Sequence, residues 1–315
     1  MLYGFGVDLG GTTVKLAYFN AAGTMLDKWE IPTNTDSEGS QILPDIAASI
    51  RGYLEQHRIA DREILGIGIG VPGPVNGQGV VDCCVNLGWG RFNVEQALSN
   101  LTGFPVRAGN DANLAALGEC WKGSGQGCSN MIMVTLGTGV GGGIILDGHV
   151  LFGTRGAAGE IGHMIINRDE PEPHTSGSRG CAEQYCSATG IVRLAARHLN
   201  STTSPSVLRQ CAPLTCKAIF DAGHEGDPAA LAILEQFYSL LGEFLANLCD
   251  VLDPDAVILG GGVSKAGQVL LDGIRPHFLK HVFHPIRDVR FDIASLGNDA
   301  GAYGAFKLAL QSFGK

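Results

Sequence analysis

The stretch that decides the fold is LYGFGVDLGGTTVKLAYF, residues 2–19. Its two ends, 2–7 and 14–19, carry the apolar and aromatic residues of β-strands, and a Gly-Gly pair separates them. A similar arrangement begins at residue 131, where MIMVTL, a glycine-rich turn and GGIILDGHV follow one another. Because each half of the chain opens with such a hairpin, the sequence predicts two similar domains.

The segments that follow each hairpin alternate between helix and strand patterns. In the first half, the spacing of Ile42, Ile46 and Ile50 predicts a helix, and ILGIGIGV (64–71) predicts a buried strand. In the second half, a long amphipathic pattern over about 228–250 precedes the strand AVILGGG. This alternation predicts an α/β fold of two similar domains with a ligand cleft between them.

The chain is long enough for two domains, with 315 residues. We expect a small N-terminal domain over 1–118 and a larger C-terminal domain over 119–298, with the closing helix at 299–315 returning to the first. Glycine is frequent, with 46 residues, which is about twice its usual share of roughly 7%. The glycines are clustered, which indicates loops that approach a ligand closely.

Charge and cysteine content exclude several classes of protein. The net charge is −9 and no segment carries a basic cluster, so we expect no nucleic-acid partner. No leader-type segment opens the sequence and no run of 18 apolar residues occurs, so we expect no membrane partner. The nine cysteines are scattered along the chain. This usage is typical of reduced thiols, so we expect a cytoplasmic protein.

The first glycine loop, DLGGTTVK at 8–15, lies between two predicted strands. We expect its glycines to adopt positive φ and to bring backbone N–H groups close to an anion. The threonine hydroxyls can donate to the same anion, and the aspartate can hold a hydrated Mg²⁺. A plain hairpin turn is the alternative. The candidate nucleotide-binding residues of this loop are Asp8, Gly10, Gly11, Thr12, Thr13 and Lys15.

Two further glycine loops follow predicted strands in the second half. LGTGVGGG at 136–143 matches neither the Walker A nor the Rossmann spacing. GGG at 260–262 precedes a predicted helix, whose N-terminus would be available to a nucleotide. Three such loops together predict a bound nucleoside triphosphate. The candidate residues of these two loops are Gly137, Thr138, Gly139, Gly261 and Gly262.

Several motifs together resemble the ROK family (repressors, open reading frames, kinases), and within it the bacterial glucokinases. These motifs are DLGGTTVK, GIGVPGPV, NLGW, GNDANLAALGE, VTLGTGVGGG, GEIGH, GCAEQYCSATGIVR and LGGGVS. They follow the order of the family and span essentially the whole chain. The resemblance implies an actin/hexokinase-like fold and a kinase that uses Mg-ATP to phosphorylate a sugar.

The resemblance also assigns roles to individual residues. It makes Asp111 in GNDAN the general base, and Asn110 a sugar ligand through its amide. Read from the motif alone, Asn and Asp at a helix start are equally explained by capping. Sugar hydroxyls both donate and accept, so carboxylates and imidazoles suit them. The further sugar-binding residues implied by the resemblance are Gly73, Glu160, His163 and Glu183, and Trp89 either lines the same pocket or belongs to the core.

The family pattern after GEIGH carries three cysteines that, with the histidine, bind a structural zinc. In this chain His174, Ser176 and Cys181 occupy those positions, so two of the three cysteines are replaced. Because serine is a poor zinc ligand and a structural site prefers four protein ligands, the resemblance implies a weakened zinc site. The residues that remain are His163, His174 and Cys181, whereas Cys186 is expected to pack at a helix start.

The resemblance therefore implies phosphorylation of a hexose by ATP, with glucose converted to glucose 6-phosphate, and a homodimer. The alternatives are a kinase for another hexose or N-acetylhexosamine (N-acetylmannosamine, allose, mannose or fructose), or a non-catalytic sugar-sensing member of the family. A repressor would need a helix-turn-helix ahead of the DLGG motif, but DLGG already begins at residue 8. We therefore expect an enzyme.

Overall fold

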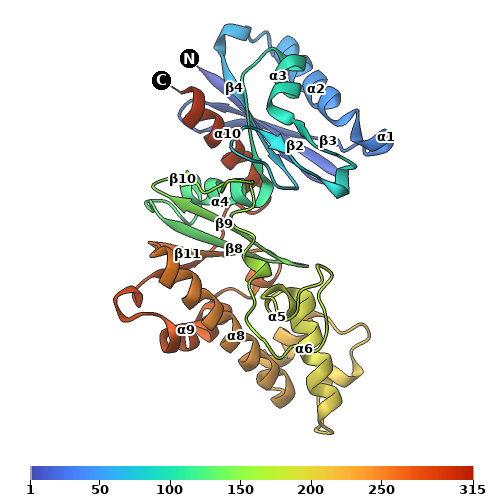
Figure 1. The fold of residues 1–315 in the computed structure, drawn as a ribbon, viewed down its shortest axis with the longest axis vertical. Coiled ribbons are helices and arrows are strands. Elements are labelled where there is room, and N and C mark those ends of the chain that lie inside the picture. Colours follow the sequence, from blue (N-terminus) through green and yellow to red (C-terminus); the bar gives the residue numbers. More distant parts are fainter. Residues whose placement is uncertain (1, 315) are drawn as a thin grey trace. The chain divides into compact units, whose positions relative to one another are not determined.

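The computed structural model describes residues 2–314, which form two five-stranded sheets with surrounding helices and divide into two compact units (Figure 1). The closing helix α10 (Ala300–Phe313) belongs to the same unit as the first strands, although it ends the chain. Of the described residues, the first unit comprises 2–129, Gly143–Gly159 and 295–314, and the second comprises Asn130–Gly142 and Glu160–Ala294.

The sheet of the first unit has five strands in the order β3-β2-β1-β4-β7. The first three strands form antiparallel pairs, whereas β4 and β7 continue the sheet in parallel with β1. The strands are β1 (Tyr3–Leu9), β2 (Thr13–Asn20), β3 (Met25–Pro32), β4 (Ile64–Val71) and β7 (Val106–Asn110), with a separate small sheet of β5 (Val80–Val81) and β6 (Phe92–Asn93).

Alternation along β1 and β4 divides their residues between the two faces of this sheet. Phe5 and Val7 share one core cluster with Ile46 of α2, whereas α10 packs on the opposite face. On that opposite face a Cβ at Gly68 would lie 1.7 Å from the carbonyl oxygen of Ala305. Glycine at every second position therefore lets the backbone of α10 approach the strands closely. The helices of this unit are α1 (Asp36–Gly39), α2 (Ile42–His57), α3 (Val94–Thr102), α4 (Asp111–Lys122) and α10.

The second sheet has the order β10-β9-β8-β11-β12, which repeats the order of the first. β11 pairs in parallel with β8 and with β12, as β4 does with β1 and β7. Asp147 and Gly148 both have positive φ, at 51° and 74°, the conformation of a tight hairpin turn that an Asp-Gly pair favours. The predicted α/β class with two similar halves is thus confirmed. The strands are β8 (Met131–Leu136), β9 (Val140–Leu146), β10 (His149–Val150), β11 (Ala256–Gly260) and β12 (Arg290–Ile293).

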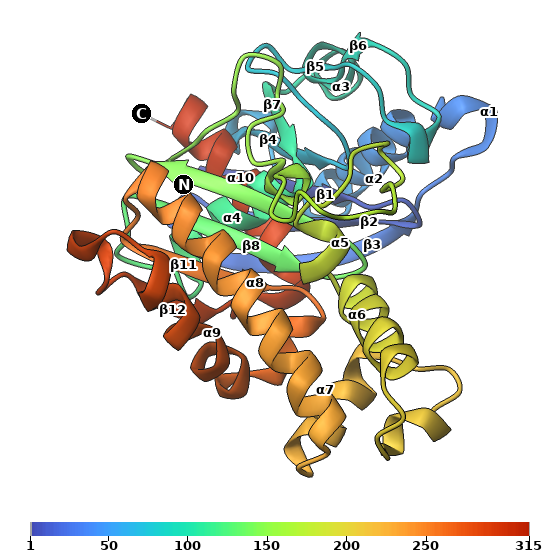
Figure 2. The ribbon, with the colours of Figure 1, turned by 60° about the horizontal axis from the view of Figure 1, so that its bottom comes forward.

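The helices of the second unit pack around the long helix α8, beside which α9 runs (Figure 2). Asp227 caps α8 and Pro228 follows at its first position, a pairing that favours a helix start. Among residues 2–314, α8 alone matches a membrane span in length and composition. However, 61% of its apolar 18-residue stretch is buried inside the protein, as in a core helix. The helices are α5 (Glu183–Cys186), α6 (Ala188–Ser201), α7 (Cys216–His224), α8 (Pro228–Leu252) and α9 (Gln268–His281).

Candidate functional site

The GNDAN motif lies where β7 ends and α4 begins. Asn110 caps α4, because its side-chain oxygen accepts the N–H of Asn113 at 3.1 Å. Its amide nitrogen donates to the carbonyl oxygen of Gly73 at 3.3 Å. The capping interpretation of Asn110 is confirmed, and the same side chain is held beside Gly73.

Asp111 is the first residue of α4 and is only partly exposed. Burial, and to a smaller extent the negative charge of Asp8, raises its pKa from 3.8 to about 6, against the opposing effect of the hydrogen bond from the N–H of Ala112. A carboxylate with a pKa near 6 is ionised at neutral pH and is a stronger base than an exposed aspartate. This is the environment that a general base requires.

Asp8 stands on β1 opposite Lys15 of β2, and their charged groups are 3.5 Å apart. Burial raises the pKa of Asp8, and Lys15 partly offsets that effect. A Cβ at Gly301 would lie 2.7 Å from the Asp8 carboxyl carbon, so glycine there makes room for the carboxylate. The two acids Asp8 and Asp111 interact unfavourably. A hydrated Mg²⁺ would relieve this repulsion, so the pair fits a divalent cation.

The turn between β1 and β2 differs from its predicted conformation. The N–H of Gly10 donates to the carbonyl oxygen of Thr13 at 3.0 Å, and the hydroxyl of Thr33 donates to the carbonyl oxygen of Gly10 at 2.7 Å. Neither Gly10 nor Gly11 adopts positive φ, so that prediction was wrong. The requirement for glycine at position 10 is instead spatial, because a Cβ there would lie 2.9 Å from the Thr13 oxygen.

The second glycine loop is hydrogen-bonded to the start of α6. The N–H of Ala188 donates to the carbonyl oxygen of Gly137, and the Thr189 hydroxyl donates to that of Thr138, both at 2.8 Å. A Cβ at Gly139 would lie 2.2 Å from a carboxylate oxygen of Glu183. Glycine at position 139 therefore lets Glu183 lie directly against this loop.

The third glycine loop also departs from expectation. Gly261 has a φ of 83°, and a Cβ there would lie 2.5 Å from the carbonyl oxygen of Leu136, so this position requires glycine. The predicted α-helix does not follow directly. A 3-10 turn, Val263–Ala266, comes first, and α9 begins only at Gln268. The residues after the glycines thus do not form an α-helix N-terminus.

The sugar-binding candidates of the second unit fall into two groups. Glu160 and His163 lie at the ends of a short 3-10 turn, about half exposed, with 3.9 Å between Oε2 and Nε2. Glu183 begins α5 and is engaged at both carboxylate oxygens. Oε1 lies 2.7 Å from Nε2 of His174, and Oε2 accepts the N–H of Val140 at 2.8 Å. His174 is thus placed beside a predicted sugar ligand.

The residues at the zinc-ligand positions of the family, His174, Ser176 and Cys181, contact other protein groups. Nδ1 of His174 is 2.9 Å from the hydroxyl of Ser176, so both of its ring nitrogens face protein oxygens. Cys181 is fully buried, with Sγ 3.9 Å from Oε1 of Gln184. Cys186 is also fully buried, as predicted. Among residues 2–314, no group of three or more His, Cys, Asp and Glu side chains is arranged to hold a metal ion. This arrangement does not fit a closed zinc site.

Comparison with known proteins decides the family. Residues 4–312 match the ROK family. This chain belongs to the ROK family. It is 42% identical to a glucokinase of Halalkalibacterium halodurans, with 97% of this chain and 94% of that protein covered. It is 36% identical to a glucokinase of Streptomyces coelicolor, with 97% of each covered. A ROK glucokinase of Streptomyces griseus, solved in complex with glucose and AMPPNP, is 34% identical with a TM-score of 0.73, covering 98% of this chain and 99% of that one.

The sequence did not predict a buried cluster of charged and polar side chains around Glu170 in this ROK chain. Glu170 is fully buried in the segment between His163 and Glu183, and Arg197 binds both of its carboxylate oxygens at 2.8 and 2.9 Å. The Tyr185 hydroxyl and Arg193 also donate to it. The hydrogen bonds from Arg197 hold the pKa of Glu170 well below its usual range. The signal in the sequence was the pair of arginines four residues apart on one helix face.

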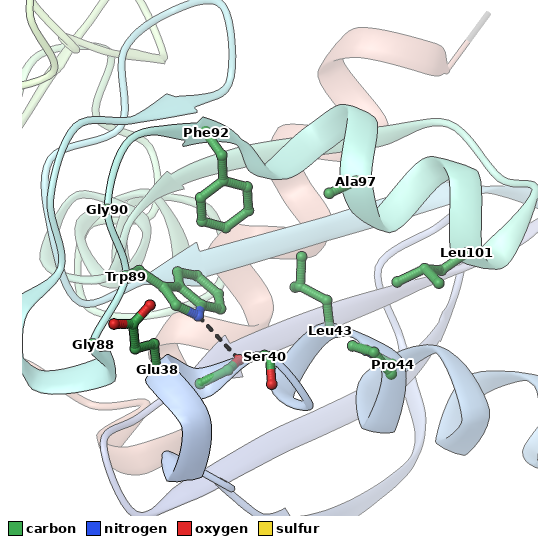
Figure 3. Close-up of a pocket in the computed structure, with 11 residues that line it drawn as sticks. Glu38, Ser40, Leu43, Pro44, Gly88, Trp89, Gly90, Phe92, Ala97 and Leu101 are labelled. Carbon is green, nitrogen blue, oxygen red and sulfur yellow. Dashed lines mark hydrogen bonds between the residues drawn. The ribbon is translucent and has the colours of Figure 1, made fainter.

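Trp89, which the sequence left open between sugar pocket and core, belongs to the core of the first unit. Only 6% of its surface is exposed, and its indole N–H donates to the carbonyl oxygen of Gly39 at 3.2 Å. Figure 3 shows its ring beside Phe92, at the wall of a pocket of about 370 Å³ that α2, α3 and the loop before β6 enclose. The aromatic pair is edge-to-face, with centroids 5.1 Å apart. The core interpretation of Trp89 is confirmed.

Proposed function

We propose that this chain is a glucokinase, which transfers the γ-phosphoryl group of ATP to glucose and forms glucose 6-phosphate. The observation that carries the proposal is the partly buried carboxylate of Asp111, with its pKa raised to about 6, at the start of α4. Full-length similarity to bacterial glucokinases supports the choice of sugar and phosphoryl donor.

Asp111 acts as the general base. At neutral pH it is mostly ionised and accepts the proton of the sugar hydroxyl while that oxygen attacks the γ-phosphorus. The amide of Asn110, which the Gly73 carbonyl orients, holds a neighbouring hydroxyl of the sugar. No covalent enzyme intermediate is needed, because positioning and charge stabilisation account for most of the catalysis of phosphoryl transfer.

In the second unit, Glu160, His163 and Glu183 bind hydroxyls of the sugar. A carboxylate accepts hydrogen bonds, and a neutral imidazole donates through one nitrogen and accepts through the other. These three side chains can therefore satisfy hydroxyl groups that both donate and accept. Such a set distinguishes hexoses by the direction of each hydroxyl, because an unpaired buried polar group is unfavourable.

The three glycine loops bind ATP through their backbone N–H groups, and Lys15, Thr12, Thr13 and Thr138 add polar side chains. Asp8 would hold Mg²⁺, and the metal, when bound, would neutralise charge on the phosphates. We propose no structural zinc in the catalytic form, because both ring nitrogens of His174 contact protein oxygens. We propose a cytoplasmic homodimer that acts in glycolysis, without a nucleic-acid or membrane partner.

The proposal is tested by ADP release, coupled to NADH oxidation, from ATP with a panel of sugars. The panel comprises glucose, mannose, fructose, allose, N-acetylglucosamine and N-acetylmannosamine. We expect kcat/KM to be highest for glucose, by tenfold or more over each of the others. A hexosamine that matches or exceeds glucose would show a different kinase, and no ADP release with any sugar would show a sugar-binding member without catalysis.

A further inference from the structure

Glu183 is held at both carboxylate oxygens by two segments far apart in sequence. Its Oε1 lies 2.7 Å from Nε2 of His174, in the loop that precedes α5. Its Oε2 accepts the N–H of Val140, in the second glycine loop, at 2.8 Å. A carboxylate offers about four lone-pair directions, so two remain for a ligand. The orientation of those two is fixed by the two contacts.

The residues after Glu183 are joined to the same glycine loop. Ala188 and Thr189 donate to the carbonyl oxygens of Gly137 and Thr138, as described above. The lack of a side chain at Gly139 allows the Glu183 carboxylate to reach the loop. The sugar-binding carboxylate and a predicted nucleotide loop thus form one hydrogen-bonded group within the second unit.

His174 is itself held in place. Its side chain is 13% exposed, and Nδ1 contacts the hydroxyl of Ser176 at 2.9 Å. Its backbone N–H donates to the carbonyl oxygen of Ser178 at 2.7 Å, which closes a tight turn in which Gly177 has a φ of 85°. Farther along, the amide of Gln184 donates to the carbonyl oxygen of Glu172, beside the buried Glu170 cluster. The imidazole is therefore a fixed donor or acceptor and not a mobile surface group.

We propose that His174 is a positioning residue of the sugar site. It orients Glu183 toward the sugar and, through Glu183 and Val140, links occupation of the sugar site to the second glycine loop. The inference rests on the proposed function, because it takes Glu183 as a sugar ligand. Fixing the carboxylate before the sugar arrives raises affinity, since less freedom is lost on binding. Because binding free energies are reciprocal, the same link makes glucose and nucleotide raise each other's affinity.

This role replaces metal binding at position 174. A zinc ligand must present a free ring nitrogen to the metal, whereas both nitrogens of His174 face protein oxygens. The chelator and metal measurements below separate the two roles, because a positioning histidine works equally well without metal.

The experiment is calorimetric titration of glucose into the full-length protein, with and without AMPPNP, before and after treatment with EDTA. The variants are His174→Ala, which removes the contact, and His174→Gln, whose amide can still donate to Glu183. The matched control is His224→Ala, which removes another histidine of the same unit, exposed at the end of α7. Zinc content and the thermal midpoint are measured for each protein.

We expect His174→Ala to raise the Kd for glucose about tenfold, the effect of losing a hydrogen bond to a charged group. In the wild type, AMPPNP should increase the affinity for glucose, and in His174→Ala this increase should largely disappear. The kcat of His174→Ala at saturating substrates should differ from that of the wild type by less than threefold. His174→Gln should recover most of the affinity, and EDTA should leave the wild-type Kd unchanged. His224→Ala should behave as wild type throughout.

Glucose affinity and coupling in His174→Ala that stay within twofold of wild type would overturn the inference while the proposed function stands. One equivalent of zinc in the wild type, lost in His174→Ala together with glucose affinity, would also overturn it in favour of a metal ligand. A wild-type protein that binds no hexose would overturn the proposed function and this inference together.

Discussion

Replacing Asp111 with asparagine should abolish phosphoryl transfer and, at the same time, stabilise the folded protein at neutral and higher pH. The pKa of Asp111 is raised from 3.8 to about 6, chiefly by burial and then by Asp8. Because the folded state favours the protonated acid, the stability that this group contributes is present below pH 3.8 and is lost as the pH rises through about 6. Asparagine removes the charge and keeps the size.

The magnitude follows from the pKa difference. Each pKa unit corresponds to about 1.36 kcal/mol, so a rise from 3.8 to about 6 corresponds to about 3 kcal/mol in unfolding free energy. Asparagine keeps an oxygen for the Ala112 N–H, but the loss of a negative charge at the start of α4 removes about 0.5 kcal/mol. Some exposure of the side chain reduces the effect further. We expect a net gain of about 2 kcal/mol at pH 8 and none at pH 3.5.

The assay is urea unfolding of the wild type and Asp111→Asn at both pH values, together with ADP release at pH 8. Turnover should fall by a factor of about 10² to 10⁴. The matched control is Asp45→Asn, in the first turn of α2, where an exposed aspartate near a helix start should give no gain at either pH. An Asp111→Asn protein no more stable than wild type at pH 8, or equally stabilised at pH 3.5, would refute the reasoning about burial.

Three other outcomes follow from the structure. Protonation of Asp111 should lower kcat/KM for glucose about tenfold per pH unit below pH 6, and a flat profile from pH 5 to 7 would exclude it as the base. Gly304→Ala should lower the unfolding free energy by about 1–3 kcal/mol, because the new Cβ would lie 1.6 Å from the Leu114 carbonyl oxygen; an unchanged urea midpoint would contradict the packing of α10. His174→Cys combined with Ser176→Cys should raise zinc content toward one equivalent by elemental analysis, whereas stoichiometric, EDTA-resistant zinc in the wild type would contradict the weakened site.

Local signals in the sequence predicted the elements well. The hairpin over 2–19, the helix that contains Ile46 and the helix that begins at Asp111 are all present, because apolar periodicity and capping residues act over a few residues. The tight turn at Asp147 was predictable for the same reason, since an Asp-Gly pair tolerates positive φ. The similarity of the two halves was also visible as a repeated strand–glycine–strand pattern.

Contacts between distant segments were not predictable in this way. The burial of Glu170 depends on Arg197, which is 27 residues away in sequence. The sequence likewise suggested a metal role for His174, but its contact with Glu183 depends on how the loop folds back on α5. Gly10 was expected to need positive φ, whereas its actual constraint is the nearby Thr13 oxygen, a property of the folded turn.

The most direct test of the central claim is ³¹P nuclear magnetic resonance of the products formed from ATP and glucose. The account predicts that the ATP signals decrease while ADP and glucose 6-phosphate appear in equal amounts, and that Asp111→Asn forms neither at a comparable rate. Release of inorganic phosphate in place of glucose 6-phosphate, phosphate attached at another hydroxyl, or wild-type turnover in Asp111→Asn would contradict the account.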